Sequence, residues 1–341
     1  MKFNRTLNPI GETLGLIYVS LHYDAIKKEL IQAINDLGIN GAEFYQKNTK
    51  IYETYVQAFM KLRKQLNNEH YQELREKEPF FFEDENIDFL TVLLSVLLRN
   101  THWQHEIDTI SENTLRKEII CDLVNGISLP QLKGTQELIA FLDALDIDQG
   151  CKWKLLKLLQ SPQLYFKQLI QILEYHLPLY QQAYSAIQEQ LIPMLSDYEK
   201  NIGNAFSDLM HTISKDQEVT PQLVFPFSQL VSYSGGYYGL LSSLLIGVKQ
   251  PEWVRKELLL KLKSLGDKSK FEILESLKKE PKCNIDLADI LHLTPATISY
   301  HMNTLITCNL VKIKKENAKL YYCISEDGIQ SIIKDLRNIL L

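Results

Sequence analysis

A run of uncharged polar side chains near the C-terminus has the chemistry of a base-reading surface. Within residues 294–303, TPATISYHMN, the side chains of Thr297, Ser299, Tyr300 and Asn303 supply hydroxyl, methyl and amide groups. In the DNA major groove such groups hydrogen-bond to adenine edges or contact thymine methyls. The run contains no lysine or arginine, so we expect it to read bases while other residues hold the phosphates.

Lysines on both sides of this run are the expected phosphate contacts. One group lies in or beside a predicted hairpin and consists of Lys312, Lys314, Lys315 and Lys319. A second group lies on a preceding predicted helix and consists of Lys268, Lys270, Lys278 and Lys279. Cationic contacts to phosphates dominate affinity for DNA and make it salt dependent. Thr294, at the start of a predicted helix, adds backbone N–H groups that favour a phosphate.

The elements that must position these residues follow one another from Leu265 onward. Residues 267–279, DKSKFEILESLKK, place Phe271, Leu274 and Leu277 on one helical face with Ile273 at its edge. A short helix is expected at NIDLADILH and a third at LTPATISYHMNTLITC, followed by an alternating hairpin at NLVKIKKENAKLYYCIS. In the third helix Thr294 is the expected cap and Pro295 the first residue. Its buried stripe should consist of Ile298, Met302, Leu305 and Ile306.

This order resembles the winged helix-turn-helix of ArsR-type repressors. The resemblance covers about the last quarter of the chain and includes LGDKSKFEIL, KKENAKLYYCIS and the pattern of Ser299, His301, Met302 and Leu305. It implies a transcription regulator that binds double-stranded DNA as a homodimer, with the helices at 252–265 and 326–340 forming the interface. The predicted DNA contacts are Thr294, Thr297, Ser299, Tyr300, His301, Asn303, Lys312, Lys314, Lys315 and Lys319.

The sequence departs from the family pattern at Tyr300 and Asn303, where members often carry basic residues. It also departs at the metal sites, because family sensors use paired cysteines at the second helix or Asp, His and Glu sets on the last one. Here Cys283 stands alone and the tail has no histidine. We therefore predict no metal and no cofactor, and we read Cys283, Cys308 and Cys323 as small buried side chains more readily than as a soft-metal site.

The charge distribution confines any nucleic-acid contact to a local patch. The net charge is −5, which argues against a surface that binds polyanions throughout. Residues 266–341 contain eleven Lys and Arg against ten Asp and Glu, so they carry +1 and residues 1–265 carry −6. A nearly neutral winged helix could instead be a protein-interaction module with Tyr300 and Met302 as anchors and the helical part as a scaffold.

Residues 1–250 are predicted to form a mainly helical sensor or interaction domain. Helix starts are marked by Asn8-Pro9, Thr135 and Ser161-Pro162, and Pro193 is a predicted kink or break. After Lys215 the sequence contains prolines, a glycine pair and short β-branched or aromatic runs. One or two short strands are therefore expected, with a tight turn at Gly235-Gly236. The alternative for Ser232 to Gly239 is a backbone nest that cradles an anion. Pro251 and Gly266 bound a connecting helix, so the second domain spans 251–341.

The predicted fold is therefore mainly α, with a small β element in the first domain and an α/β winged helix in the second. No GxGxxG, GxxxxGK[ST], GxSxG or HExxH motif occurs, so no catalytic residue is predicted. Two alternatives remain open in the first domain. His102, His105 and Glu106 share a helical face that could chelate a cation, although a solvated polar face is the ordinary use. Tyr175, Tyr180, Tyr184 and Tyr198 could line the cavity of a small-molecule effector or pack in the core.

The expected location is the reducing cytoplasm. The five cysteines are odd in number and far apart, which argues against a disulfide framework. The N-terminal residues lack the apolar segment of a signal peptide, and FLTVLLSVLL at 89–98 is too short to span a bilayer. We expect this segment to be a buried helix and the protein to have no membrane contact.

Overall fold

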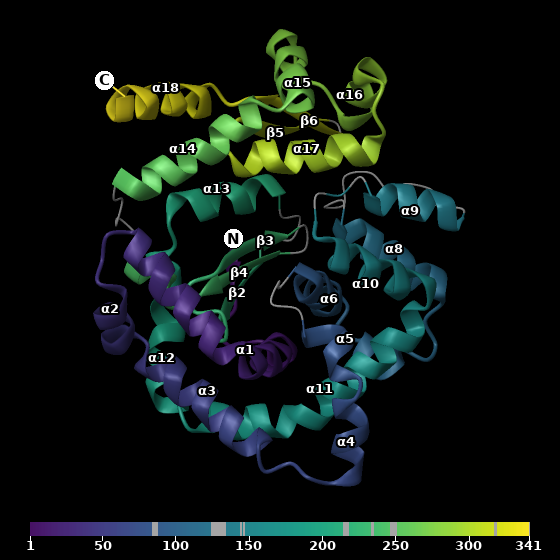
Figure 1. The fold of residues 1–341 in the computed structure, drawn as a ribbon, viewed down its shortest axis with the longest axis vertical. Helices are drawn as coiled ribbons and strands as arrows, with labels where there is room; N and C mark the ends of the chain where they lie inside the picture. Colours follow the sequence, from purple (N-terminus) through teal and green to yellow (C-terminus); the bar gives the residue numbers. More distant parts are fainter. Residues whose placement is uncertain are drawn as a thin grey trace. The chain divides into compact units, whose positions relative to one another are not determined.

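The computed structural model describes residues 1–340 except 84–87, 124–133, 144, 146, 214–217, 233–234, 246–250 and 317–318. It divides into two compact units. The first comprises 1–35, 39–122 and 149–247, and the second comprises 36–38, 123–148 and 248–341. The fold is mainly helical with a small sheet, as predicted (Figure 1). The predicted domain boundary near 250 falls in 246–250, outside the described residues.

Local sequence signals start several helices of the first unit. Asn8 accepts backbone hydrogen bonds from Ile10 and Gly11 at 3.0 and 3.3 Å, so the predicted cap is confirmed. The helices are α1 (Pro9–Asp36), α2 (Gly41–Asn48), α3 (Lys50–Arg63), α4 (Glu69–Arg75), α5 (Glu78–Phe82), α6 (Asp88–Arg99), α7 (Trp103–Glu106), α8 (Glu112–Leu123), α10 (Gln149–Gln160), α11 (Pro162–Ser185), α12 (Gln188–Asp197) and α13 (Asn204–Ile213), with short 3-10 turns at Tyr198–Asn201 and Ser242–Leu245.

Two sequence predictions about these helices meet different outcomes. The segment at 89–98 lies within α6, and Phe89, Leu93 and Val96 are buried, so the buried helix is confirmed. Of the kink or break predicted at Pro193, the break does not occur. Pro193 lies inside α12, and the chain leaves helical geometry instead between α11 and α12, at Ile187 (φ −120°). Pro193 is the sixth residue of α12, where its ring interrupts only one of the hydrogen bonds of the helix.

The sheet of the first unit has four strands in the order β1-β2-β4-β3, more than the one or two predicted. The strands are β1 (Lys2–Phe3), β2 (Glu218–Gln222), β3 (Gln229–Ser232) and β4 (Gly235–Gly239). β2 pairs in parallel with β1 and β4, and β3 pairs antiparallel with β4. The glycine pair was predicted to form the turn, but Gly235 and Gly236 are the first residues of β4. A Cβ at Gly236 would lie 2.4 Å from Met210 Sδ, so a glycine allows α13 to pack directly on the strand.

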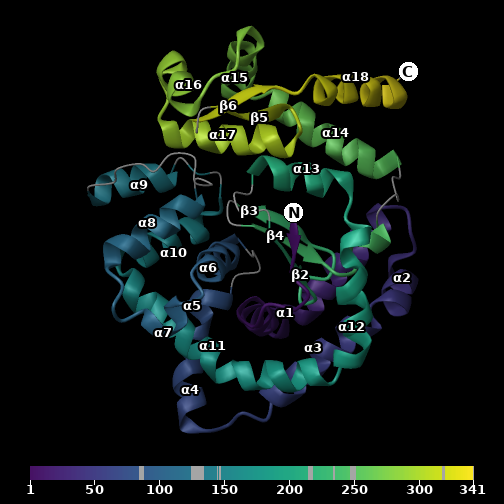
Figure 2. The same ribbon diagram turned by 180° about the vertical axis from the view of Figure 1, so that it is seen from behind.

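α3 and α11 lie side by side in the first unit (Figure 2). Tyr55 of α3 is fully buried, and its ring meets that of Tyr180 edge-on at 6.4 Å. At the end of α3, Arg63 donates to the buried Glu78 carboxylate and, at 2.8 Å, to Ser20 Oγ. His176 Nε2 lies 3.6 Å from the other carboxylate oxygen. Burial lowers the pKa of His176 to about 4, so a charged pair lies beside a neutral imidazole.

The second unit contains the predicted order of helix, helix, turn, helix and wing. Its C-terminal elements are α14 (Pro251–Leu265), α15 (Lys268–Lys279), α16 (Asn284–Leu291), α17 (Pro295–Thr307), β5 (Val311–Glu316), β6 (Lys319–Ile324) and α18 (Glu326–Leu340), and α9 (Thr135–Asp143) belongs to the same unit. β5 and β6 form an antiparallel hairpin, and Lys282 extends it through a bridge to Tyr322. The winged helix-turn-helix is therefore confirmed.

Candidate nucleic-acid interface

The turn before α17 is built by local capping. His292 ends α16 with a left-handed backbone (φ 55°). Thr294 Oγ1 then accepts the backbone N–H of Thr297 at 3.1 Å, and Pro295 is the first helical residue. Both predictions for this helix start are confirmed. The hydroxyls of Thr294 and Thr297 also lie 2.8 Å apart, so the first turn of α17 presents two linked hydroxyl groups.

One face of α17 is buried against the rest of the winged helix. Ile298, Met302 and Leu305 are completely buried and Ile306 nearly so, which confirms the predicted stripe. This face contacts α15, α16 and β5. Outside this stripe, Thr294 and Thr307 are exposed, and Thr297, Tyr300 and Asn303 are half-buried.

The prediction that Ser299 lies on the exposed face is wrong. Ser299 is only 2% exposed, and its Oγ accepts a hydrogen bond from Asn284 Nδ2 at 2.5 Å. Ser299 directly follows Ile298, and both positions turn toward α16, where a small hydroxyl fits between closely packed helices. Buried polar groups in proteins are normally hydrogen-bonded, and this bond ties the start of α16 to α17. We therefore remove Ser299 from the predicted DNA contacts.

Tyr300 and His301 lie beside the first helix of the motif. Lys270 Nζ is 5.8 Å from the centre of the Tyr300 ring, within the range of a cation–π interaction. The same ammonium lies 3.6 Å from Asp267 Oδ2. The Lys270 backbone N–H donates to Asp267 Oδ1 at 2.9 Å and lowers the pKa of that carboxyl below its ordinary value. Lys270 is thus buried and committed to these contacts, which argues against its predicted role as a phosphate contact.

The orientation predicted for α15 needs a related correction. Ile273, Leu274 and Leu277 are buried, but Phe271 is 48% exposed. Lys270 occupies the buried stripe in its place, because a long side chain can lay its methylene groups along apolar surface. Lys268, Lys278 and Lys279 remain exposed on this helix.

The wing presents two described lysines to solvent. Lys312 and Lys314 are both exposed and lie two residues apart on β5, hence on the same face of the hairpin. Lys312 Nζ lies 2.7 Å from Asp327 Oδ2, so part of its charge is already compensated. The side chains of Lys315 and Lys319 lie outside the described part of the structure. Lys314 is therefore the clearest cationic contact that the wing offers.

The helices that flank the motif carry exposed apolar side chains. α14 packs against α18, and Leu258 and Ile332 are buried. Other large apolar side chains of the same helices are exposed, namely Leu259, Leu260, Ile333 and Leu340. Exposed apolar side chains gathered on two adjacent helices are typical of a protein–protein contact.

The other predicted chemistry is not assembled in the described residues. In that part of the chain, no three His, Cys, Asp or Glu side chains are grouped as a metal would require. All five cysteines are free. Tyr180 and Tyr198 are buried packing residues, and the Tyr198 hydroxyl lies 2.8 and 3.0 Å from the carbonyl oxygens of Asn4 and Val219, which share its proton. Among the described helices, none is long and apolar enough to cross a membrane.

Comparison with known proteins places the similarity in the same C-terminal region. The family model described as bacterial regulatory protein, arsR family, matches residues 267–312. An arsenical resistance operon repressor of Staphylococcus aureus is 35% identical over 81 residues, which cover 24% of this chain and 78% of that protein. The corresponding repressor of Bacillus subtilis is 28% identical over 76 residues, or 22% of this chain and 72% of that protein.

A third relative comes from an archaeon. An uncharacterized HTH-type transcriptional regulator of Methanocaldococcus jannaschii is 34% identical over 73 residues, which cover 21% of this chain and 82% of that protein. No solved structure matches the chain. Each of the three relatives covers less than a quarter of this chain.

Proposed function

Because the chain belongs to the arsR family of bacterial regulatory proteins, we propose that its winged helix binds operator DNA as a homodimer controlled by the N-terminal domain. The chain is a DNA-binding transcriptional regulator, and we assign it no catalytic role. The observation that carries the proposal is the polar face of α17, where Thr297 and Asn303 lie opposite the buried Ile298 and Met302. Such a helix can enter a major groove and present hydrogen-bonding groups to base edges.

The proposed contacts divide base reading from phosphate binding. Thr297, Tyr300 and Asn303 supply uncharged groups on α17, and His301 lies next to them. Thr294 places the N-terminus of the helix toward a phosphate. Lysines of the wing and of α15 supply the positive charge. The affinity for DNA should therefore depend strongly on salt concentration, although α17 itself contains no lysine or arginine.

The proposed homodimer uses α14 and α18. Their exposed leucines and Ile333 would be covered by the same residues of a second copy, as a two-fold interface requires. The two copies of α17 must then lie roughly 34 Å apart to reach successive major grooves.

The five free cysteines support the proposal that the protein works in the reducing cytoplasm.

The proposal is tested by binding to the DNA upstream of the protein's own gene, using mobility shifts at two salt concentrations together with light scattering. We expect a dimer in solution, a footprint with two half-sites about one helical turn apart, and weaker binding at the higher salt. A monomer that protects one half-site would contradict the dimer. Absence of any shift at either salt would favour a protein-interaction module.

Replacing Lys314 by alanine should weaken binding to operator and to unrelated DNA by similar factors. Lysine contacts to phosphate carry no sequence information, and each one contributes about one unit to the slope of log affinity against log salt concentration. The slope should therefore fall by about one unit. Lys61→Ala, which removes a charge from an exposed position of α3 in the first unit, is the matched control and should leave the slope unchanged. A slope unaffected by Lys314→Ala would rule out this contact.

Replacing Asn303 by alanine should weaken binding to the operator but not to unrelated DNA. An amide that pairs with a base contributes to discrimination rather than to general affinity, so operator binding should weaken about tenfold. Binding to unrelated DNA and the salt slope should stay as in the unmodified protein. Equal losses on both DNAs would show that Asn303 does not read a base.

A further inference from the structure

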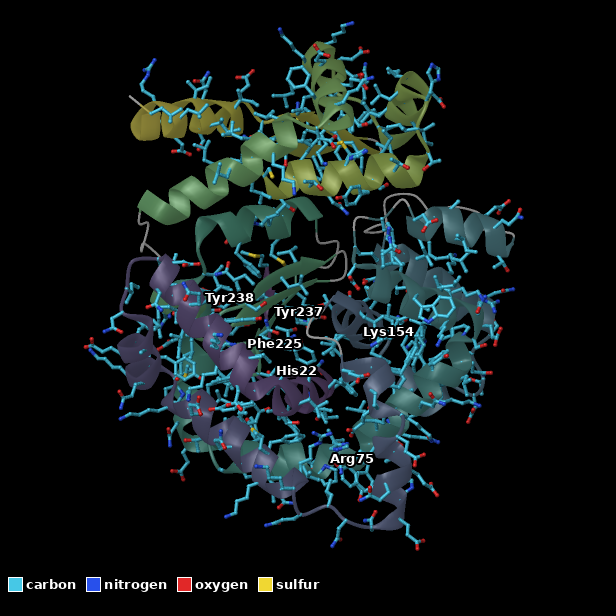
Figure 3. The ribbon with its side chains drawn as sticks, viewed as in Figure 1. His22, Arg75, Lys154, Phe225, Tyr237 and Tyr238 are labelled. Atoms are coloured by element: carbon cyan, nitrogen blue, oxygen red, sulfur yellow. The ribbon has the colours of Figure 1, made fainter. Side chains whose placement is uncertain are left out.

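A cavity of about 420 Å³ lies within the first unit, between α1, α6 and the sheet. Its walls include Leu94 and Leu98 of α6, together with Val224, Phe225 and Tyr237 from the sheet side. Phe225 and Tyr237 are labelled in Figure 3. Sites for small molecules have this size and character, with mostly apolar walls and a few placed polar groups.

α6 packs one apolar face in the core and turns a mixed face toward the cavity. Phe89, Leu93 and Val96 are buried. Thr91, Leu94, Ser95 and Leu98 follow one another at helical spacing and line the cavity instead. Leu94 and Leu98 stay partly exposed there. A ligand that covered these side chains would remove apolar surface from water, which favours binding.

The cavity also contains a buried acid. Glu12 lines it and is only 2% exposed. Its Oε1 accepts the backbone N–H of Leu223 at 2.8 Å, and its Oε2 accepts Val224 N–H at 3.1 Å and the Tyr55 hydroxyl at 2.9 Å. A carboxylate has about four acceptor positions, so Oε1 retains one. Among the described residues, no cation forms an ion pair with Glu12.

Among the described residues, the titratable groups around Glu12 do not neutralise its charge. The titratable side chains that face Glu12 or line the cavity beside it are the phenols Tyr52, Tyr55, Tyr180 and Tyr237. Burial raises the pKa of each of them, so all four are uncharged near neutral pH. On the α6 side, Arg99 and Asp122 bond to one another, and Asp122 also accepts from Ser95.

We propose that this cavity binds an apolar small molecule with a cationic amine head, which pairs with Glu12. The ammonium would fill the remaining acceptor position of Oε1 and supply the missing positive charge in a poorly solvated site. The hydrocarbon part would cover Leu94, Leu98 and Phe225. The assignment of this molecule as the effector rests on the proposed function, whereas its binding does not.

Three probes with one hydrocarbon chain and different heads test the site by titration calorimetry on the full chain. They are octylamine, 1-octanol and octanoate. At pH 8 we expect octylamine to bind one to one, at least tenfold more tightly than 1-octanol, and octanoate not to bind. Burial raises the pKa of Glu12 to about 7, and the alkylammonium stays charged throughout this range. Octylamine affinity should therefore fall about tenfold from pH 8 to pH 6, in step with the ionised fraction of Glu12.

Gly11→Leu is the variant that decides the location. A Cβ at Gly11 would meet only the Leu98 methyl groups, at 3.6 and 3.7 Å, so a larger side chain can enter the cavity without striking the backbone. We expect at least a tenfold loss of octylamine binding with an unchanged circular dichroism spectrum. Gly11→Ala, which leaves most of the space open, should bind within about threefold of the unmodified protein. Glu12→Gln should abolish the preference for the amine, although it also disturbs the bonds to Leu223 and Val224.

Octanoate binding as tight as that of octylamine, or undiminished octylamine binding by Gly11→Leu, would overturn the proposed site. Operator affinity measured with and without saturating octylamine tests the regulatory role separately. Tight octylamine binding with no change in operator affinity would contradict the regulatory role but not the binding site. Failure to bind any DNA would sink the proposed function, while calorimetry would still decide the cavity.

Discussion

Replacing Arg63 by methionine is expected to lower the free energy of unfolding of the first unit by about 3–5 kcal/mol. The substitution removes the guanidinium that pairs with Glu78 and leaves a carboxylate that is almost completely buried. An unpaired buried charge loses its hydration without compensation. Urea unfolding followed by tryptophan fluorescence reports this change, since Trp103 is buried in the same unit.

The loss should depend on pH. Burial raises the pKa of Glu78 even in the presence of Arg63, and removal of the guanidinium raises it further. A protonated carboxyl is less costly to bury, so the deficit of Arg63→Met should be smaller at pH 5 than at pH 8. A deficit that grows as the pH falls would contradict this account.

Two variants separate the pair from a general loss of charge. Arg75→Met removes an exposed arginine whose charge also lowers the pKa of Glu78. It should lower the free energy of unfolding by less than about 1 kcal/mol. Adding Glu78→Gln to Arg63→Met should restore part of the loss, because it removes the stranded charge. If Arg75→Met costs as much as Arg63→Met, the buried pair is not the cause.

Replacing Gly328 by alanine is expected to destabilise the winged helix by about 3 kcal/mol. A Cβ at this position would lie 1.7 Å from the backbone oxygen of Asn309 and 3.1 Å from Ser325 Oγ. Asn309 ends the turn after α17 with a left-handed backbone (φ 54°), and Ser325 N–H donates to the carbonyl of Leu310 at 2.9 Å. The start of α18 is thus pressed against the turn that joins α17 to β5, and the added methyl must move backbone atoms.

Hydrogen exchange of peptides from 295–340 measures this effect where it occurs. Protection of α17 and α18 should fall in Gly328→Ala, and operator binding should weaken with it because the wing and α17 lose their fixed geometry. Gly266→Ala is the matched control, since its Cβ would lie 3.4 Å from the nearest atom, Leu262 O. Unchanged protection in Gly328→Ala would show that the contact can relax at little cost.

The winged helix could be predicted element by element because its signals are local. Thr294 and Pro295 mark the start of α17, and the apolar spacing from Ile298 to Ile306 assigns its buried face. The errors arise where a neighbouring helix decides the outcome. Ser299 has no sequence feature that announces its bond to Asn284, and Lys270 looks like a surface cation although it fills a core position.

The first unit was less predictable because its defining contacts join distant segments. The residues that line the cavity come from α1, α6 and the strands beyond residue 218. Glu12 gives no spacing signal in the sequence, since its partners Leu223 and Val224 are about two hundred residues away. β1 has only two residues, too few to show a strand pattern. The tyrosines considered for a cavity lie between residues 175 and 198, whereas the tyrosine that lines the cavity is Tyr237 of β4.

The parallel pairing of Lys2 with Glu218 sets the moment at which the first unit can be completed during translation. At ordinary rates of synthesis, the strand that pairs with β1 leaves the ribosome on the order of 10–40 s after it. Throughout that interval Glu12 lacks its backbone donors and the apolar faces of α1 and α6 lack the sheet. The winged helix can fold without this delay, because its contacting residues are close in sequence and lie within one segment. A nascent chain of this protein therefore exposes these apolar faces in its helical half and covers them only when the sheet emerges.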